Sequence, residues 1–172
     1  MLISGREAAA RLAEIGMPRR QVRIALDAGL AGEPVRTRAA TLYEAARVAE
    51  LAARPLVAMG AVYRACPYGL LVDRRVTLGG SAVGSSVEEV SDVDLGLWRA
   101  FDIAASIRHH GPFPYVATIC GFVVRGGDIV EVRHIRDTVY ALAVDEPGAW
   151  FDQWRGRRWP TGPGRQWLVL GR

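Results

Sequence analysis

The chain contains no lysine and no asparagine, so all 22 of its basic residues are arginine. An arginine side chain keeps its charge and offers a planar fork of donors that fits phosphates and the edge of guanine. Cysteine is also scarce. Cys66 and Cys120 are too few for a disulfide framework and wrongly spaced for a metal site. We therefore expect a reduced, cytoplasmic protein with no metal and no cofactor.

Long apolar runs are missing as well. No stretch reaches the roughly 18–20 residues that cross a membrane, and residues 1–16 lack the basic and apolar regions of a secretory signal. Half of the 172 residues are nevertheless hydrophobic, which supplies a core and argues against disorder. The sequence predicts a folded protein with no membrane partner.

Charge is distributed unevenly along the chain. Residues 1–55 hold nine arginines against six acids, whereas residues 56–149 hold eight arginines against eleven acids. Residues 150–172 then hold five arginines against one acid. The basic first and last segments are therefore candidates for binding an anionic partner. We predict two domains, 1–55 and 56–172.

The first 30 residues have the pattern of two short helices joined by a turn. Ser4-Gly-Arg-Glu7 is a capping box and begins a helix that Gly16 ends. A second helix is predicted from Pro18 to Ala28, with Gly29 as its C-terminal cap. Two helices meeting through a short glycine-containing turn are typical of a helix-turn-helix.

The second helix has the features of a DNA-reading element. Val22, Ala25 and Leu26 would pack inward, which directs the polar residues Arg19, Arg20, Gln21 and Arg23 outward. A helix fits the major groove, and its N-terminal residues reach base edges most easily. Arginine pairs with guanine and glutamine with adenine. We therefore interpret this face as a candidate base-reading surface.

Residues 33–43 predict a small hairpin, or wing, and residues 44–53 predict a third helix. Arg36 and Arg38 are two positions apart, so on a strand they would leave from the same face. Such a pair can reach phosphates or a narrow minor groove. Thr37 and Tyr43 complete the candidate DNA-binding set.

The stretch REAAARLAEIGMPRRQVRIALDAGLAGEPVRTRAATLYEAARVAEL, within residues 4–53, resembles the winged helix-turn-helix of MerR-type and excisionase-type DNA-binding proteins. That resemblance implies a helix-turn-helix, a two-stranded wing and a following helix that begins near an aromatic residue. MerR-type proteins often continue into a long dimerising coiled coil. Here Arg54-Pro55 ends the helix and no heptads follow.

Residues 56–172 are predicted to form a mixed α+β domain with an antiparallel sheet. We expect a loop at 79–86, helices at 94–110 and 147–154, and a tight turn at Gly126-Gly127. The expected strands are 56–63, 69–78, 115–124, 128–135, 138–144 and 167–170. We expect this domain to serve dimerisation, a protein partner or a ligand.

The basic tail admits two interpretations. Its arginines could be secondary phosphate contacts beside stacking tryptophans, or their stems could cover tryptophans that belong to the core. The candidate phosphate contacts are Arg155, Arg157, Arg158 and Arg165.

No enzymatic pattern is present. Asp92 and Asp94 favour a helix start over a nuclease site, and residues 79–86 lack the ending of a phosphate-binding loop. We expect a sequence-specific DNA-binding protein of the nucleoid, most simply a transcriptional regulator that binds double-stranded DNA as a homodimer or through DNA-assisted assembly. The alternatives are an excisionase-like recombination factor and an antitoxin-like module that binds a protein through 56–172.

Overall fold

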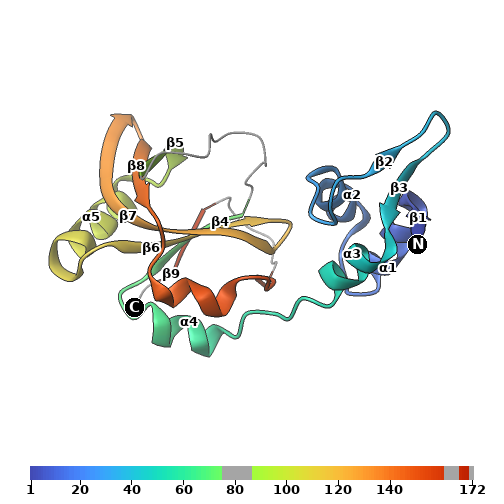
Figure 1. Ribbon diagram of the computed structural model, residues 1–172. Helices are drawn as coiled ribbons and strands as arrows, with labels where there is room; N and C mark the ends of the chain where they lie inside the picture. The colour runs from blue at the N-terminus through green and yellow to red at the C-terminus, as the bar shows by residue number, and fades with distance from the viewer. Residues whose placement is uncertain (75–86, 161–166, 171–172) are drawn as a thin grey trace. The chain divides into compact units, whose positions relative to one another are not determined.

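The structure, a computed structural model, describes residues 1–74, 87–160 and 167–170 and has an α+β fold. The chain divides into two compact units, Met1–Pro55 and Leu56–Arg172 (Figure 1). No helix in the described part of the chain is both long enough and apolar enough to cross a bilayer.

The first unit combines three helices with a small antiparallel sheet. Its elements are β1 (Leu2–Ser4), α1 (Gly5–Ala13), α2 (Arg19–Asp27), β2 (Val35–Arg36), β3 (Thr41–Glu44) and α3 (Ala45–Ala52). The strand order is β1-β3-β2, and Figure 1 shows the β2–β3 hairpin projecting beyond the helices. The sequence did not predict β1, a three-residue strand in which only Ile3 is buried.

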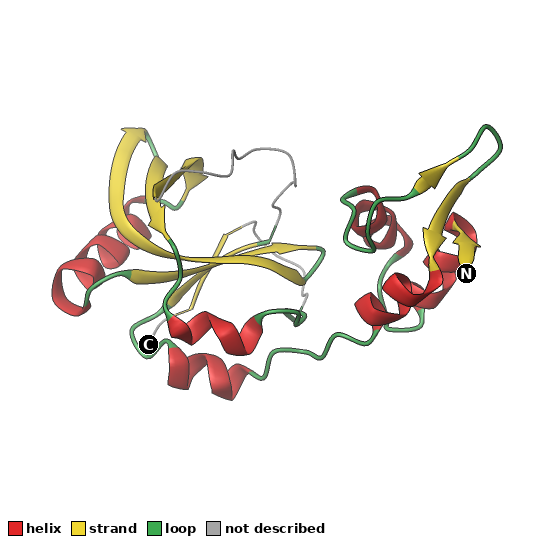
Figure 2. Ribbon diagram, viewed as in Figure 1, coloured by secondary structure: helices red, strands yellow, loops and turns green. Residues whose placement is uncertain are grey.

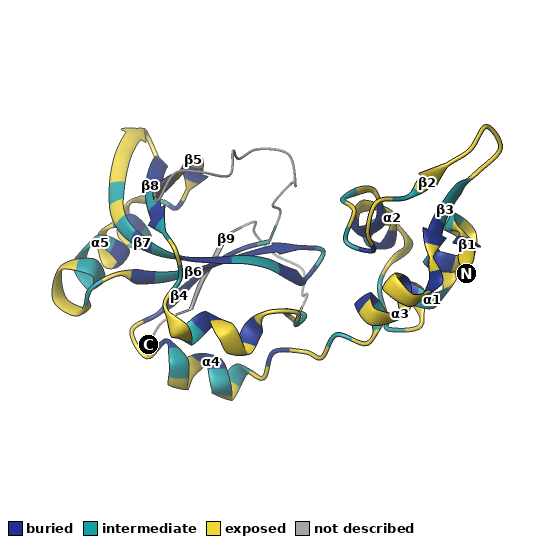
Figure 3. Ribbon diagram, in the orientation of Figure 1, coloured by how far each residue is buried: buried dark blue, intermediate teal, exposed yellow. Residues whose placement is uncertain are grey.

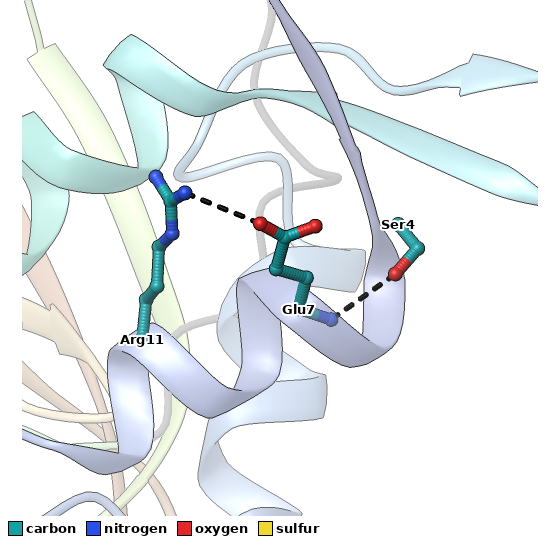
Figure 4. Close-up of polar contacts among 3 residues, drawn as sticks. All are labelled: Ser4, Glu7 and Arg11. Atoms are coloured by element: carbon teal, nitrogen blue, oxygen red, sulfur yellow. Dashed lines mark hydrogen bonds and ion pairs between the residues drawn. The ribbon is translucent and has the colours of Figure 1, made fainter.

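The start of α1 follows the expected cap in part. The Ser4 hydroxyl accepts a hydrogen bond of 3.2 Å from the Glu7 backbone N–H (Figure 4). The Glu7 carboxylate does not return to the Ser4 backbone; it accepts a 3.3 Å hydrogen bond from Arg11, one turn along the helix. One orphan amide of the first turn is thereby satisfied, and the remaining contact is an exposed ion pair.

The first unit has its own core. Leu12 of α1, Val22 of α2 and Val48 of α3 are each at most 1% exposed. Side chains of this size contribute about 1.5–3 kcal/mol each when fully buried. The three helices are thus fixed to one another by apolar burial.

In the second unit the described strands form one six-stranded sheet of order β5-β8-β7-β6-β4-β9. All neighbouring pairs are antiparallel except β4 and β6, which run parallel. The elements are α4 (Met59–Ala65), β4 (Leu70–Asp73), β5 (Val87–Asp94), α5 (Leu97–His110), β6 (Phe113–Ile119), β7 (Phe122–Arg136), β8 (Val139–Asp145), the 3₁₀-helix η1 (Ala149–Trp154) and β9 (Trp167–Leu170).

Helices cover both faces of this sheet. Ile103 of α5 packs with Leu71 and Tyr115 on one face. Val62 of α4 and Trp154 of η1 pack with the alternate residues of the strands on the other. Figure 2 shows α4 and η1 lying side by side beneath the strands. Because successive side chains of the central strands point to opposite faces of the sheet, they contribute to two separate cores, one on each face.

Three predictions for the second unit are wrong. Residues 56–63 are not a strand; they lead into α4, because a short apolar run fits a buried helix equally well. Residues 87–94 are a strand, although acidic residues at 92 and 94 had favoured a helix start. The predicted loop at 79–86 lies outside the described residues.

The third error concerns Gly126 and Gly127, which lie inside β7 and not in a turn. A Cβ atom at Gly126 would meet the Phe151 ring at 2.4 Å, and one at Gly127 would meet Val144 Cγ1 at 2.3 Å. These glycines permit close packing against η1 and β8. The turn between β6 and β7 lies instead at Cys120-Gly121, where both residues have positive φ.

Candidate nucleic-acid interface

Helix α2 carries most of the candidate residues. Gly16, with φ of +80°, lies in the turn that follows α1, and Pro18 precedes α2 as its N-cap. Val22, Ala25 and Leu26 are buried, as the sequence predicts. Their burial fixes the rotation of α2, and Arg19, Arg20 and Arg23 are therefore exposed.

The three arginines of α2 differ in their partners. Arg23 forms an exposed ion pair with Asp27, with an N–O distance of 3.5 Å. Arg19 and Arg20 make no hydrogen bond or ion pair with any residue in the described ranges. Their charge is consequently available to an external anion. The Arg23–Asp27 pair, being solvent-exposed, contributes about 0.2–1 kcal/mol and is readily exchanged for a phosphate.

Gln21 does not lie with the exposed arginines as expected. Its side chain is half-buried, and Oε1 is a buried atom without a hydrogen-bond partner in the described structure. The reason is its position beside the buried residue Val22, on the edge of the packed face. An adenine contact from Gln21 would therefore require its side chain to change rotamer.

The sequence-based prediction did not include two exposed residues of α2, Ile24 and Asp27. Ile24 is 45% exposed and follows Arg20 by one helical turn, as Asp27 follows Arg23. The periodicity that buries Val22 and Leu26 places both on the outer face and could have found them. In a major groove, an apolar side chain contacts the thymine methyl group and a carboxylate accepts from the cytosine amino group.

The hairpin is formed, but Arg36 and Arg38 do not share a strand face. Arg36 ends β2, whereas Arg38 lies in the turn that follows. Thr37 shapes that turn. Its hydroxyl donates to the Ala40 carbonyl at 2.9 Å and accepts from the Ala40 N–H at 2.9 Å. The Thr37 hydroxyl is therefore occupied by hydrogen bonds within the turn, and Arg38 lies at the tip of the hairpin.

Tyr43 is a packing residue. It is 5% exposed, and its ring lies against Gly5, where an added Cβ would be 3.6 Å away. Burial raises the pKa of the Tyr43 hydroxyl, Asp27 raises it further, and Arg36 lowers it. The enclosed side chain of Tyr43 gives no support to the predicted DNA contact.

The tail arginines are engaged within the second unit. Arg155 pairs with Asp152 at 3.1 Å and lies over the Phe151 ring at 4.9 Å. Arg157 donates to the Gln153 carbonyl, and Arg158 forms bridges with Leu56 and Phe122. These contacts agree with the packing interpretation and engage all three tail arginines that lie within the described residues. Arg165 lies outside the described residues.

Other reactive groups do not assemble into a site. Within the described ranges, no three histidine, cysteine or acidic side chains are placed to hold a metal ion. Burial raises the pKa of the Cys66 thiol to about 12 and also raises that of Cys120. Neutral thiols are poor nucleophiles. His110 stacks on Tyr68 with ring centroids 3.7 Å apart.

Comparisons with known proteins identified no relative of this chain. No family model, no curated protein and no solved structure matches this chain.

Proposed function

We propose that residues 1–55 are a winged helix-turn-helix that binds double-stranded DNA and that the chain is a transcriptional regulator of the nucleoid. In this proposal α2 enters the major groove. The β2–β3 hairpin is the wing and lies against the phosphates. The two DNA-contacting elements belong to one unit whose helices are fixed by a shared core.

The observation that carries the proposal is the set of exposed arginines that have no partner within the described structure. Arg19 and Arg20 lie in the first turn of α2, and Arg38 lies at the tip of the hairpin. Arginines gathered on one surface produce a positive potential that attracts an anionic partner. Arginine forks match guanine and phosphate, so a duplex supplies both kinds of contact.

The positions of the arginines indicate which part of the duplex each would contact. Arg20 is at the N-terminal end of α2, where side chains reach base edges, so we assign it to guanine. Arg36 and Arg38 are on the hairpin, so we assign them to phosphates. Ile24 and Asp27 extend the reading surface along α2.

The test is selection of duplexes from a random DNA pool with the full chain, followed by affinity measurement at fixed salt. We expect one enriched sequence that binds about 10³-fold or more tightly than a scrambled duplex. Equal affinity for selected and scrambled DNA would contradict sequence-specific binding. Mapping of bound sites across the genome then separates the roles: promoters support regulation, and attachment sites support the excision alternative.

A further inference from the structure

Ile24 is an exposed apolar side chain on the outer side of α2. This helix carries both buried and exposed residues (Figure 3), and its buried face consists of Val22, Ala25 and Leu26. Ile24 is 45% exposed. Among the residues of α2, all of which the structure describes, it is the one large apolar side chain that is exposed. The core of the first unit therefore does not account for its position.

The neighbours of Ile24 on the helix surface are charged. Residues three and four positions apart on a helix lie side by side, so Ile24 lies beside Arg20 and Asp27. Arg23, which precedes Ile24, pairs with Asp27 at 3.5 Å, whereas Arg20 has no ion-pair partner in the described ranges. Ile24 is thus a single apolar group bordered by charge.

A single apolar side chain among arginines fits duplex DNA better than it fits a protein. A stable protein partner covers about 20–30 residues on each side, with an apolar centre. The major groove instead offers phosphates and guanine edges to arginine, and its apolar group is the C5-methyl of thymine. That methyl group is a feature by which thymine differs from the other three bases.

Building on the DNA binding proposed above, we propose that Ile24 is a specificity-determining residue that contacts the C5-methyl group of a thymine. The four residues from Arg20 to Ile24 advance about 6 Å along the helix, and successive base pairs are about 3.4 Å apart. The thymine therefore lies about two base pairs from the guanine assigned to Arg20. Isoleucine is stiff at χ1 in a helix, so this contact costs little side-chain freedom.

The test removes the methyl group from the DNA and the side chain from the protein. In the duplex selected by the full chain, each thymine is replaced in turn by deoxyuridine, which keeps every hydrogen-bonding group and lacks only the methyl. We expect the affinity of the wild type to fall about three- to tenfold at one position. That position should lie about two base pairs from the one at which Arg20→Ala relaxes the preference.

The protein variant completes a double-mutant cycle. Ile24→Ala should bind the thymine duplex more weakly by a similar factor and should lose nothing further with deoxyuridine, because both changes delete the same contact. Leu2→Ala is the matched control, since Leu2 is 49% exposed on β1 of the same unit. It should respond to deoxyuridine as the wild type does. Circular dichroism checks that Ile24→Ala remains folded, as expected because alanine is the better helix former.

The affinity of the wild type for the unmodified duplex is measured first and separates two kinds of failure. If the wild type binds the selected duplex no better than a scrambled one, both the proposed function and the role of Ile24 are overturned. Selective binding without a deoxyuridine-sensitive position near that guanine overturns the role of Ile24 alone. The same holds if Ile24→Ala remains as sensitive to deoxyuridine as the wild type.

Discussion

Arg20 and Arg47 are both exposed helical arginines, yet their surroundings differ. Arg47 lies between Glu44 and Glu50, at 4.0 Å and 3.4 Å, whereas Arg20 has no counterpart among the described residues. Arg20→Ala should cost about 1–3 kcal/mol of binding to the selected DNA site and relax the preference at one base pair. Arg47→Ala is the control and should change neither. Fluorescence anisotropy with single-base variants of the site measures both, and an unaltered Arg20→Ala protein would remove α2 from the groove.

Gly127 is a residue whose missing side chain is structural. A methyl group there would lie 2.3 Å from Val144 Cγ1, so Gly127→Ala should destabilise the second unit by about 1–3 kcal/mol. Gly60→Ala is the control. Its nearest neighbour would be a flexible Arg64 nitrogen at 3.6 Å, and the change should stabilise α4 by up to about 1 kcal/mol. All five tryptophans lie in 56–172, so their fluorescence during urea unfolding reports on this unit alone. Equal stability of the two variants would contradict the packing described.

Residue-level patterns predicted the buried positions of α2 well, because a helix that packs on one side has a strict period. They failed at Tyr43 and Gln21 for a different reason. Whether a polar residue at the edge of a packed face is enclosed depends on which elements lie beside it. Tyr43 is enclosed by α1 at Gly5, a contact between positions far apart in sequence.

At the scale of elements, the N-cap of α1 offers a local test. Ser4→Ala removes the acceptor of the Glu7 N–H and should cost about 1 kcal/mol of helix stability. Hydrogen exchange of the Glu7 amide should accelerate accordingly, while Ser4→Asp should retain protection because aspartate is an equally good cap. An unchanged exchange rate in Ser4→Ala would mean that the 3.2 Å contact contributes nothing.

The β2–β3 hairpin makes a prediction that concerns salt. Each phosphate contact releases counterions, so Arg36→Ala with Arg38→Ala should lower the salt slope of DNA binding by about two. The affinity of this double variant for selected and for scrambled duplexes should fall by similar factors, since phosphates carry no sequence information. Arg64→Ala, an exposed arginine of α4, is the control. If slope and affinity both stay at the wild-type values, the hairpin does not contact DNA.

Elements with strong local signals were predictable from sequence, and elements defined by their neighbours were not. Gly16, Pro18 and Gly29 predicted the limits of α2 to within a residue or two. By contrast, β1 exists because β3 is available to pair with it. The glycines of β7 were interpreted as a turn because the sequence cannot show that Phe151 and Val144 approach them. The exposure of Leu97, Trp98 and Phe101 on α5 could likewise not be predicted, since only the sheet determines which face of that helix is covered.

At the scale of the whole molecule, the described structure has no long coiled coil to hold two copies of the proposed DNA-binding unit together. One unit of this size makes few base contacts, so tight binding should require two half-sites. The full chain should therefore bind a duplex with two half-sites more tightly than a duplex with one half-site. Equal affinity for the two duplexes would mean that a single first unit suffices for specific binding.

The segment between the units is a short tether. Helix α3 ends at Ala52, and Val57 is already buried in the second unit, where its N–H donates to the Arg158 carbonyl at 2.7 Å. Residues 53–56 are all that remain between these anchors, and a stretch of this length spans at most about 17 Å. If the first units bind DNA as proposed, tethers of this length limit how far two of them can separate and turn about one duplex. Insertion of about five base pairs, half a turn of the duplex, between the half-sites should therefore abolish joint binding, whereas a long flexible connection would tolerate it.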